Sequence, residues 1–263
     1  MYCHGVLLDA DQRAHFVEHG WLVVRGAVPP QRVAELEHAV DEIYRAWPAV
    51  APGQVWELAG VSRMSPAIAA HAHHAAIGQR VAELLGCARV KLLQDTVLVK
   101  AARIGGPVAW HQDHTYTGYL DPARAVSVRL ALTDCTRDNG CLEVISGSHA
   151  WGLLGDVRAL TESHIADALG PVAAHWQDRV TALELAPGDL SIHHCLTLHH
   201  SGDNPSAAAR KTLISRLFDG DCRLARDRLP DGAAAYFPVE ADGTLTDAAF
   251  PVVYRGPGAG APP

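Results

Sequence analysis

The chain has 263 residues, a formal charge of −7 at pH 7, and a composition that is 48% hydrophobic and 19% charged. This balance excludes a disordered protein, and a chain of this length can bury roughly three quarters of the surface that its unfolded form exposes. No run approaches the ~18 consecutive apolar residues of a membrane span, and the first residues lack the basic and then apolar order of a signal peptide. We therefore expect a cytoplasmic protein with no membrane contact.

The cysteine and charge patterns exclude two further classes of protein. The six cysteines are scattered without a C-x-x-C pair, which argues against a zinc finger or a disulfide scaffold. Clustered positive charge is missing from this net acidic chain, so nucleic acid is not an expected partner. The unusual residue is histidine, with 16 copies, because histidine is the commonest metal ligand and also a general base.

The first third of the chain predicts mainly helices. Gly20 and Gly86 each stand where a periodic apolar pattern stops, and Pro30 stands where another begins. The expected elements form a helical layer from about residue 9 to 86, with a helix at 11–19, a strand at 21–25, a helix from Pro30 to about 47, and a helix at 77–85.

After residue 86 the chain changes to short apolar runs separated by turn residues. Asn139-Gly140 and Pro187-Gly188-Asp189 are two of the turn signals. Many short strands after a helical layer indicate a mostly β fold, a sandwich or barrel, and not a doubly wound α/β sheet. The expected strands, forming a core at about 90–220, are 90–100, 126–133, 141–145, 180–185, 190–199 and 212–218.

One domain is expected over residues 1–255, since no linker or internal repeat interrupts the chain. The remaining residues, 256–263, are rich in Gly, Pro and Ala. This composition predicts a disordered tail.

Two segments carry candidate chemistry. His111 and Asp113 form an H-x-D motif, and residues two apart on a strand point to the same face, so both side chains could reach one metal ion. A facial iron site needs a third ligand, which His199 could supply from another strand. Arg210 could sit on the neighbouring strand, where a guanidinium can bind a carboxylate through two parallel hydrogen bonds.

These segments resemble the phytanoyl-CoA dioxygenase family of iron(II)- and 2-oxoglutarate-dependent oxygenases. The similarity extends from about Phe16 to Val253, nearly the whole chain. The matching features are Trp110-His111-Gln112-Asp113, Asn139-Gly140-Cys141-Leu142, Ser146-Gly147-Ser148-His149, Gly188-Asp189, and the pattern H-x-S-G-x-N-x-S-x-x-x-R from His199 to Arg210.

The resemblance implies a double-stranded β-helix, a jelly-roll or cupin-like barrel of two facing sheets with N-terminal helices packed against it. It further implies that His111, Asp113 and His199 ligate iron(II). Arg210 would bind the distal carboxylate of 2-oxoglutarate, assisted by Ser201, and O2 would be the second cosubstrate.

Other candidate residues follow from the resemblance less directly. Gln94, on the strand before the metal motif, is expected to bind the cosubstrate or to face the substrate. This chain departs from many relatives at two positions. Many relatives have Pro where this chain has Ile145. Many also have Trp near the position of Arg129, where it lines the cosubstrate pocket, so Arg129 places a cation beside the active site. Residue type alone leaves the roles of three histidines open, namely His193, His194 and His200. The residues assigned to substrate binding are Arg129, His114, Tyr116 and Trp151.

The expected activity is oxidation of a small organic metabolite, most simply a hydroxylation, with release of succinate and CO2. Related halogenases replace the metal-binding carboxylate with Ala or Gly, whereas Asp113 is present here. Desaturation, cyclisation and alcohol oxidation remain open, as do the substrate and the oligomeric state. The alternative is a non-catalytic or cupin-like metal-binding β-barrel that does not use 2-oxoglutarate. We expect a role in natural-product or other specialised metabolism.

Overall fold

The computed structural model describes residues 8–48, 50–155, 159, 165–167, 175–229 and 238–257. The predicted disordered tail lies outside the described residues from residue 258 onward. The helices are α1 Ala10–His19, α2 Pro30–Arg45, α3 Pro66–Ala72, α4 Ala75–Leu85 and α5 His114–Thr117. The strands are β1 Trp21–Val24, β2 Trp56–Ala59, β3 Arg89–Lys100, β4 Val108–His111, β5 Leu120–Asp121, β6 Ala125–Ala131, β7 Leu142–Ile145, β8 Val180–Leu183, β9 Leu190–His194, β10 His199–Ser201, β11 Arg210–Asp219, β12 Arg223–Leu224 and β13 Val252–Arg255.

The predicted helix ends are confirmed by their capping geometry. The Asp9 carboxylate accepts a hydrogen bond from the backbone N–H of Gln12 at 2.7 Å and so begins α1. Gly20 ends α1 in the left-handed conformation, at φ 76°, where a Cβ would lie 2.3 Å from the ring of His149. Gly86 ends α4 in the same way, at φ 60°. Helix α3 and strand β2 were not predicted, because both are short.

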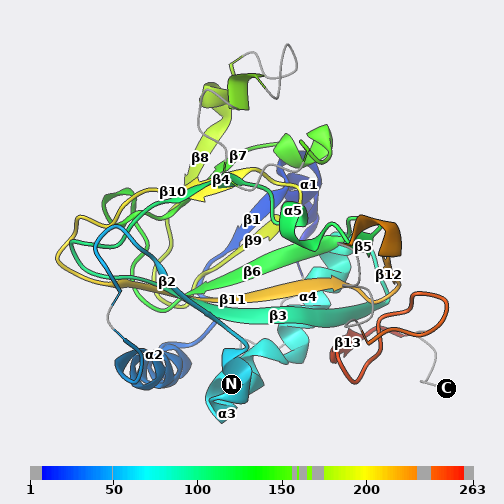
Figure 1. The fold of residues 1–263 in the computed structure, drawn as a ribbon, viewed down its shortest axis with the longest axis horizontal. Coiled ribbons are helices and arrows are strands. Elements are labelled where there is room, and N and C mark those ends of the chain that lie inside the picture. Colours follow the sequence, from blue (N-terminus) through cyan, green and yellow to red (C-terminus); the bar gives the residue numbers. More distant parts are fainter. Residues whose placement is uncertain are drawn as a thin grey trace.

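The larger sheet is antiparallel and has the strand order β1-β9-β6-β11-β3-β13, with β2 also paired to β3. The two long strands β3 and β11 pair along their whole length. In Figure 1, α2, α3 and α4 lie along one side of this sheet. The main hydrophobic core forms between them, because the apolar faces of these helices pack on the sheet.

The two faces of the larger sheet differ in chemistry. Along β6, Val126, Val128 and Leu130 belong to the main core under the helices, whereas the alternating Ser127 and Arg129 line a cavity on the opposite face. Every residue of β6 is buried, so both faces are covered. The polar face is therefore internal, and it is the face on which the candidate site lies.

A smaller sheet, in the order β4-β10-β7-β8, covers the polar face (Figure 1). Its central strand β10 pairs His199 with His111 of β4 on one side and with Val144 of β7 on the other. The two sheets face each other across the cavity. No strand pair among the described residues joins them into a closed hydrogen-bonded barrel.

One predicted strand is wrong. Residues 190–199 form two strands: β9 belongs to the larger sheet and β10 to the smaller one. The chain turns between them, where the backbone N–H of Thr197 donates to the carbonyl of His194 at 2.8 Å and the Thr197 hydroxyl donates to the carbonyl of Gly20 at 2.8 Å. This turn carries the chain from one sheet to the other.

The predicted fold class is confirmed. Antiparallel strands dominate, helices precede them, and two facing sheets form the double-stranded β-helix. None of the helices in the described ranges has both the length and the apolar character that crossing a membrane requires.

Candidate active site

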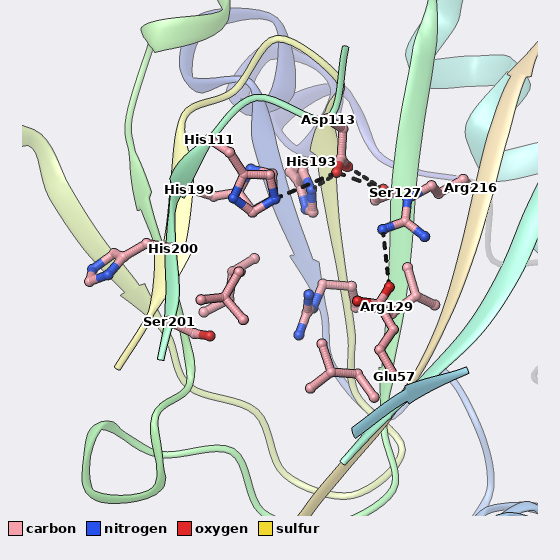
Figure 2. A pocket seen from close by; sticks show the side chains of 14 residues that line it. Glu57, His111, Asp113, Ser127, Arg129, His193, His199, His200, Ser201 and Arg216 are labelled. Carbon is pink, nitrogen blue, oxygen red and sulfur yellow. Dashed lines mark hydrogen bonds and ion pairs between the residues drawn. The ribbon is translucent and has the colours of Figure 1, made fainter. Parts of the chain in front are cut away.

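The site is built around His111, Asp113 and His199, whose ligand atoms all lie within 4.8 Å of one another. Oδ1 of Asp113 lies 3.9 Å from Nε2 of His111 and 3.8 Å from Nε2 of His199. Figure 2 shows the two imidazoles side by side, facing the carboxylate. The sequence therefore predicted correctly that these three side chains meet.

The reason given for the meeting of His111 and Asp113 was wrong. His111 is the last residue of β4, but Asp113 has helical backbone angles, φ −57° and ψ −33°, and directly precedes α5. Strand alternation therefore does not bring the two side chains together. The chain leaves the small sheet after His111 and turns, and that turn directs the carboxylate back toward the histidines.

Backbone carbonyl groups orient both imidazoles. Nδ1 of His111 lies 2.8 Å from the carbonyl oxygen of Ala109, and Nδ1 of His199 lies 2.9 Å from that of Thr197. Since a carbonyl only accepts hydrogen bonds, each Nδ1 donates, and each Nε2 is the ring nitrogen that faces Asp113. Burial lowers the pKa of His199 well below its ordinary value, so this ring is neutral, as metal binding requires.

Asp113 is held by one of its two oxygens. Oδ2 accepts hydrogen bonds from Oγ of Ser127 at 2.6 Å and from Nε2 of His193 at 3.2 Å. Burial by itself raises the pKa of Asp113, but the hydrogen bond from His193 and the positive charge of Arg216 outweigh this effect and hold the pKa well below its usual range. The carboxylate is therefore ionised, with Oδ1 left to face the histidines.

The three histidines left open by the sequence have different surroundings. His193 supports Asp113, and its ring lies 4.3 Å from that of His199. His194 is partly buried near His149, and desolvation lowers its pKa to about 4. His200 points away from the three central residues in Figure 2, and its Nε2 lies 2.8 Å from Oε2 of Glu143.

An inner cavity of about 50 Å³ lies between the two sheets, beside the three central residues. Ser201 of β10 lines this cavity and is buried, as its predicted role requires. Arg129 of β6 also lines it, and its side chain projects into the space in Figure 2.

Arg210 does not line the inner cavity, although it lies in the same part of the fold. It begins β11 opposite Lys100 and is fully buried. It donates a hydrogen bond to the carbonyl of Gly140, while its Nε and Nη2 have no hydrogen-bond partner among the described residues. An unpaired buried guanidinium is costly, so this arrangement is suited to an anion that is not part of the chain.

A second, mouth cavity of about 530 Å³ shares His111, Asp113 and Arg216 with the inner one. Gln94 and Tyr116 line this cavity, and the ring of Tyr116 lies edge-on to that of His111 at 5.8 Å. Gln94 is therefore placed on the mouth side of the site and not among the residues of the inner cavity.

Two residues assigned to substrate binding lie outside both cavities. His114 is buried at the start of α5, where its backbone N–H donates to the carbonyl of Cys195 at 2.9 Å. Trp151 packs against a separate apolar cluster that contains Trp110, with the guanidinium of Arg179 6.0 Å from the centre of its ring. Neither side chain lines the space beside the three central residues.

Sequence reasoning missed the role of Ser127 and left that of His193 open. These residues are register partners on the adjacent strands β6 and β9, so their side chains lie on the same face of the sheet. The available signal was a polar residue alternating with valines along the predicted strand at 126–133. That signal identifies an internal polar face but not the partner of each side chain.

Two histidines and one carboxylate beside an open cavity form the ligand set of a non-haem iron site, and the donors here are oriented and ionised as that set requires. The chain belongs to the phytanoyl-CoA dioxygenase (PhyH) family, whose model matches residues 16–212. The resemblance inferred from the sequence is therefore confirmed.

Individual relatives agree with this family. A phytanoyl-CoA dioxygenase 1 from Oryza sativa subsp. japonica is 34% identical over 146 residues, covering 54% of this chain and 50% of the relative. The matches to such curated relatives span about half of their length.

Solved structures share the fold at lower identity. The carbocyclase SnoK from nogalamycin biosynthesis, described as non-heme and alpha ketoglutarate dependent, is 22% identical with a TM-score of 0.76, over 93% of this chain and 96% of its own. The epimerase SnoN, crystallised with Fe3+, alpha ketoglutarate and nogalamycin RO, is 22% identical with a TM-score of 0.73, over 92% of this chain and 97% of its own.

Proposed function

We propose that this chain is an iron(II)- and 2-oxoglutarate-dependent dioxygenase that hydroxylates a small organic metabolite and releases succinate and CO2. The observation that carries the proposal is the position of the His111, Asp113 and His199 donors, all directed at one point beside two cavities. Family membership supports the same reaction class.

Iron(II) bound by these three residues would supply the oxidising chemistry, with three coordination positions open to the 2-oxoacid and to O2. The chain supplies the orientation of the ligands. Ser127 and His193 hold Oδ2 of Asp113, and backbone carbonyls hold the Nδ1 atoms of both ligand histidines. The ligand atoms therefore need little rearrangement when a metal binds.

The inner cavity suits a dicarboxylate. The end lined by His111, Asp113 and His199, here called the metal end, would receive the 2-oxoacid group of 2-oxoglutarate. Ser201 and the nearby guanidinium of Arg210 would hold its distal carboxylate. A guanidinium is suited to this role because it can offer two parallel N–H donors to one carboxylate.

The mouth cavity suits the organic substrate. It reaches His111 and Asp113 and has space for a small metabolite. We assign Gln94 and Tyr116 to this substrate cavity on the basis of their positions in its lining. A role in natural-product metabolism is supported by the nogalamycin enzymes that share the fold.

We also propose that residues 1–255 act as one domain. Support comes from the larger sheet, in which β1, near the start of the chain, and β13, near its end, both take part. The N-terminal helices share one hydrophobic core with that sheet.

The test is an anaerobic titration of the iron(II)-loaded protein with 2-oxoglutarate, followed by visible absorption. Bidentate chelation of iron(II) by the 2-oxoacid gives a weak charge-transfer band, so we expect a saturable band in the native protein and none in a His111→Ala variant. Admission of O2 should then yield succinate. A folded, iron-loaded protein without a saturable band would favour the metal-binding barrel that does not use 2-oxoglutarate.

A further inference from the structure

Three cationic side chains lie close enough to affect one another's charge: Lys100 on β3, Arg129 on β6 and Arg210 on β11. All three strands belong to the larger sheet, and Lys100 and Arg210 are register partners. Like charges directly opposite each other repel. Burial, followed by the charges of Arg210 and Arg129, lowers the pKa of Lys100 to about 7.

Among the described residues, none of the three takes part in an ion pair. Lys100 donates to the backbone carbonyls of Ser201 and Gly202, and Arg210 to that of Gly140. Arg129 makes no hydrogen bond within the described part of the chain, although its side chain is only 7% exposed. Buried cations that lack an ion-pair partner in the described part of the chain indicate a site for an external anion.

Arg129 is the cation that the inner cavity presents. It lines that cavity together with the three candidate metal ligands and Ser201, whereas Arg210 lies behind the lining. Its register partner on β9, Ser191, has a buried hydroxyl that finds no hydrogen-bond partner in the described ranges of the chain. Side chains of paired residues share a face, so a second unsatisfied donor lies beside the guanidinium.

The position of Arg129 along β6 suits the distal end of a short dicarboxylate. Ser127, which holds Asp113, is two residues earlier on the same face, and two strand residues span roughly 6.6 Å. The mouth cavity does not include Arg129 in its lining, so its guanidinium faces the cosubstrate side and not the substrate side.

We propose that Arg129 binds the distal carboxylate of 2-oxoglutarate directly, as a second anchor in front of Arg210. The inference rests on the proposed function. It gives Arg129, which stands where many relatives have Trp, a role in determining cosubstrate specificity. It also makes the pocket selective for a 2-oxoacid with a second negative charge.

The test compares two 2-oxoacids by calorimetry on the anaerobic iron(II)-loaded protein, which measures binding without turnover. 2-Oxoglutarate has the distal carboxylate, and 2-oxopentanoate has the same chain length without it. We expect Arg129→Met to weaken 2-oxoglutarate binding by roughly 10- to 100-fold and to leave 2-oxopentanoate unchanged. Arg129→Lys should recover part of the loss, because the charge remains but the forked geometry is lost.

Thermal unfolding of the protein without cosubstrate is the second readout. Removing an unpaired buried cation should leave the Tm of Arg129→Met equal to or above that of the native protein, whereas loss of a structural arginine would lower it. Saturating 2-oxoglutarate should then raise the Tm of the variant less than that of the native protein. Arg129→Gln provides the same comparison should the methionine variant not fold.

Several outcomes separate this inference from the proposed function. Failure of the native protein to bind 2-oxoglutarate would contradict the proposed function itself. Native binding with an unchanged preference between the two acids in Arg129→Met would overturn the second anchor alone. Equal loss of both acids would overturn it as well, because a carboxylate anchor acts only on the dicarboxylate.

Discussion

The two ends of the inner cavity differ in how their charges are balanced. At the metal end, Oδ2 of Asp113 has two donors, and Nδ1 of both His111 and His199 has a carbonyl acceptor. At the other end, Arg129 and Arg210 have no carboxylate partner among the described residues. The metal end is organised before its metal binds, whereas the cationic end becomes electrostatically balanced only with an anion. One end of the cavity therefore requires a metal and its chelating group, and the other end requires an anion. A dicarboxylate that chelates the metal meets both requirements.

The largest expected effect is at the metal end. Asp113→Ala removes one of three ligands and its negative charge, so iron affinity should fall by more than the roughly 100-fold typical of losing a group that only supports a ligand. Iron content after dialysis measures this. The matched control is His38→Ala, a surface histidine on α2 whose side chain is 70% exposed, which should retain iron. Equal iron content in the two variants would contradict the assignment.

The next effect separates the two ends. Arg210→Met should weaken 2-oxoglutarate binding by roughly 10- to 100-fold while iron content stays unchanged, because the guanidinium is remote from the metal ligands. Lys211→Met is the control, since Lys211 pairs with Glu37 and Asp41 of α2 on the other face of the sheet. Calorimetry on iron(II)-loaded proteins checks both. Loss of iron from Arg210→Met would contradict the claim that metal binding at one end of the cavity is independent of the cations at the other end.

A smaller effect tests whether the metal end is organised by its supporting groups. Ser127→Ala removes one donor to Asp113 and should weaken iron binding by roughly 10-fold, the lower part of the usual range for such supporting groups. Metal-competition titration measures the affinity. At saturating iron, 2-oxoglutarate affinity should be unaffected. An unchanged iron affinity would show that Asp113 needs no support from this hydroxyl.

The last effect is on folding stability and not on binding, and it concerns histidines outside the cavity lining. Burial lowers the pKa of His71 to about 3 and that of His194 to about 4, while both have a pKa near 6.5 when unfolded. The unfolded chain therefore binds more protons below pH 6.5, and the free energy of unfolding decreases as pH falls from 6.5 toward 4. Each group contributes at most about 1.4 kcal/mol per pH unit.

Urea unfolding at pH 7.5, 6 and 5 measures this dependence. His71→Asn should flatten the decrease relative to the native protein, because one of the two titrating groups is gone. An identical pH dependence in the native protein and the variant would rule out His71 as a source of the acid instability.

The metal ligands were predictable because two short motifs of fixed spacing contain them, one with His111 and Asp113 and one that begins at His199. His193 and Ser127 were not assigned in advance, since their contact with Asp113 requires that β6 and β9 be neighbours. The turn between β9 and β10 was missed because residues 195–198 contain neither Gly nor Pro, and the hydrogen bonds of Thr197 make the turn instead.

Side-chain direction was the other limit. Arg129 was recognised as a departure, but only the register of β6 reveals that it faces the inner cavity. His114 follows Asp113 directly and Trp151 follows the Ser146–His149 motif, yet both side chains point elsewhere, because α5 and the apolar cluster around Trp110 take them away from the cavities. Proximity in sequence to a motif did not determine orientation.

The central claim is that one cavity holds a metal at one end and a carboxylate at the other. A crystal structure of the protein with manganese(II), an iron(II) substitute, and 2-oxoglutarate tests it most directly. We predict the 2-oxoacid group on a metal held by His111, Asp113 and His199, with the distal carboxylate in contact with Arg129 and near Arg210. A metal bound elsewhere, or a distal carboxylate directed into the mouth cavity, would contradict this account.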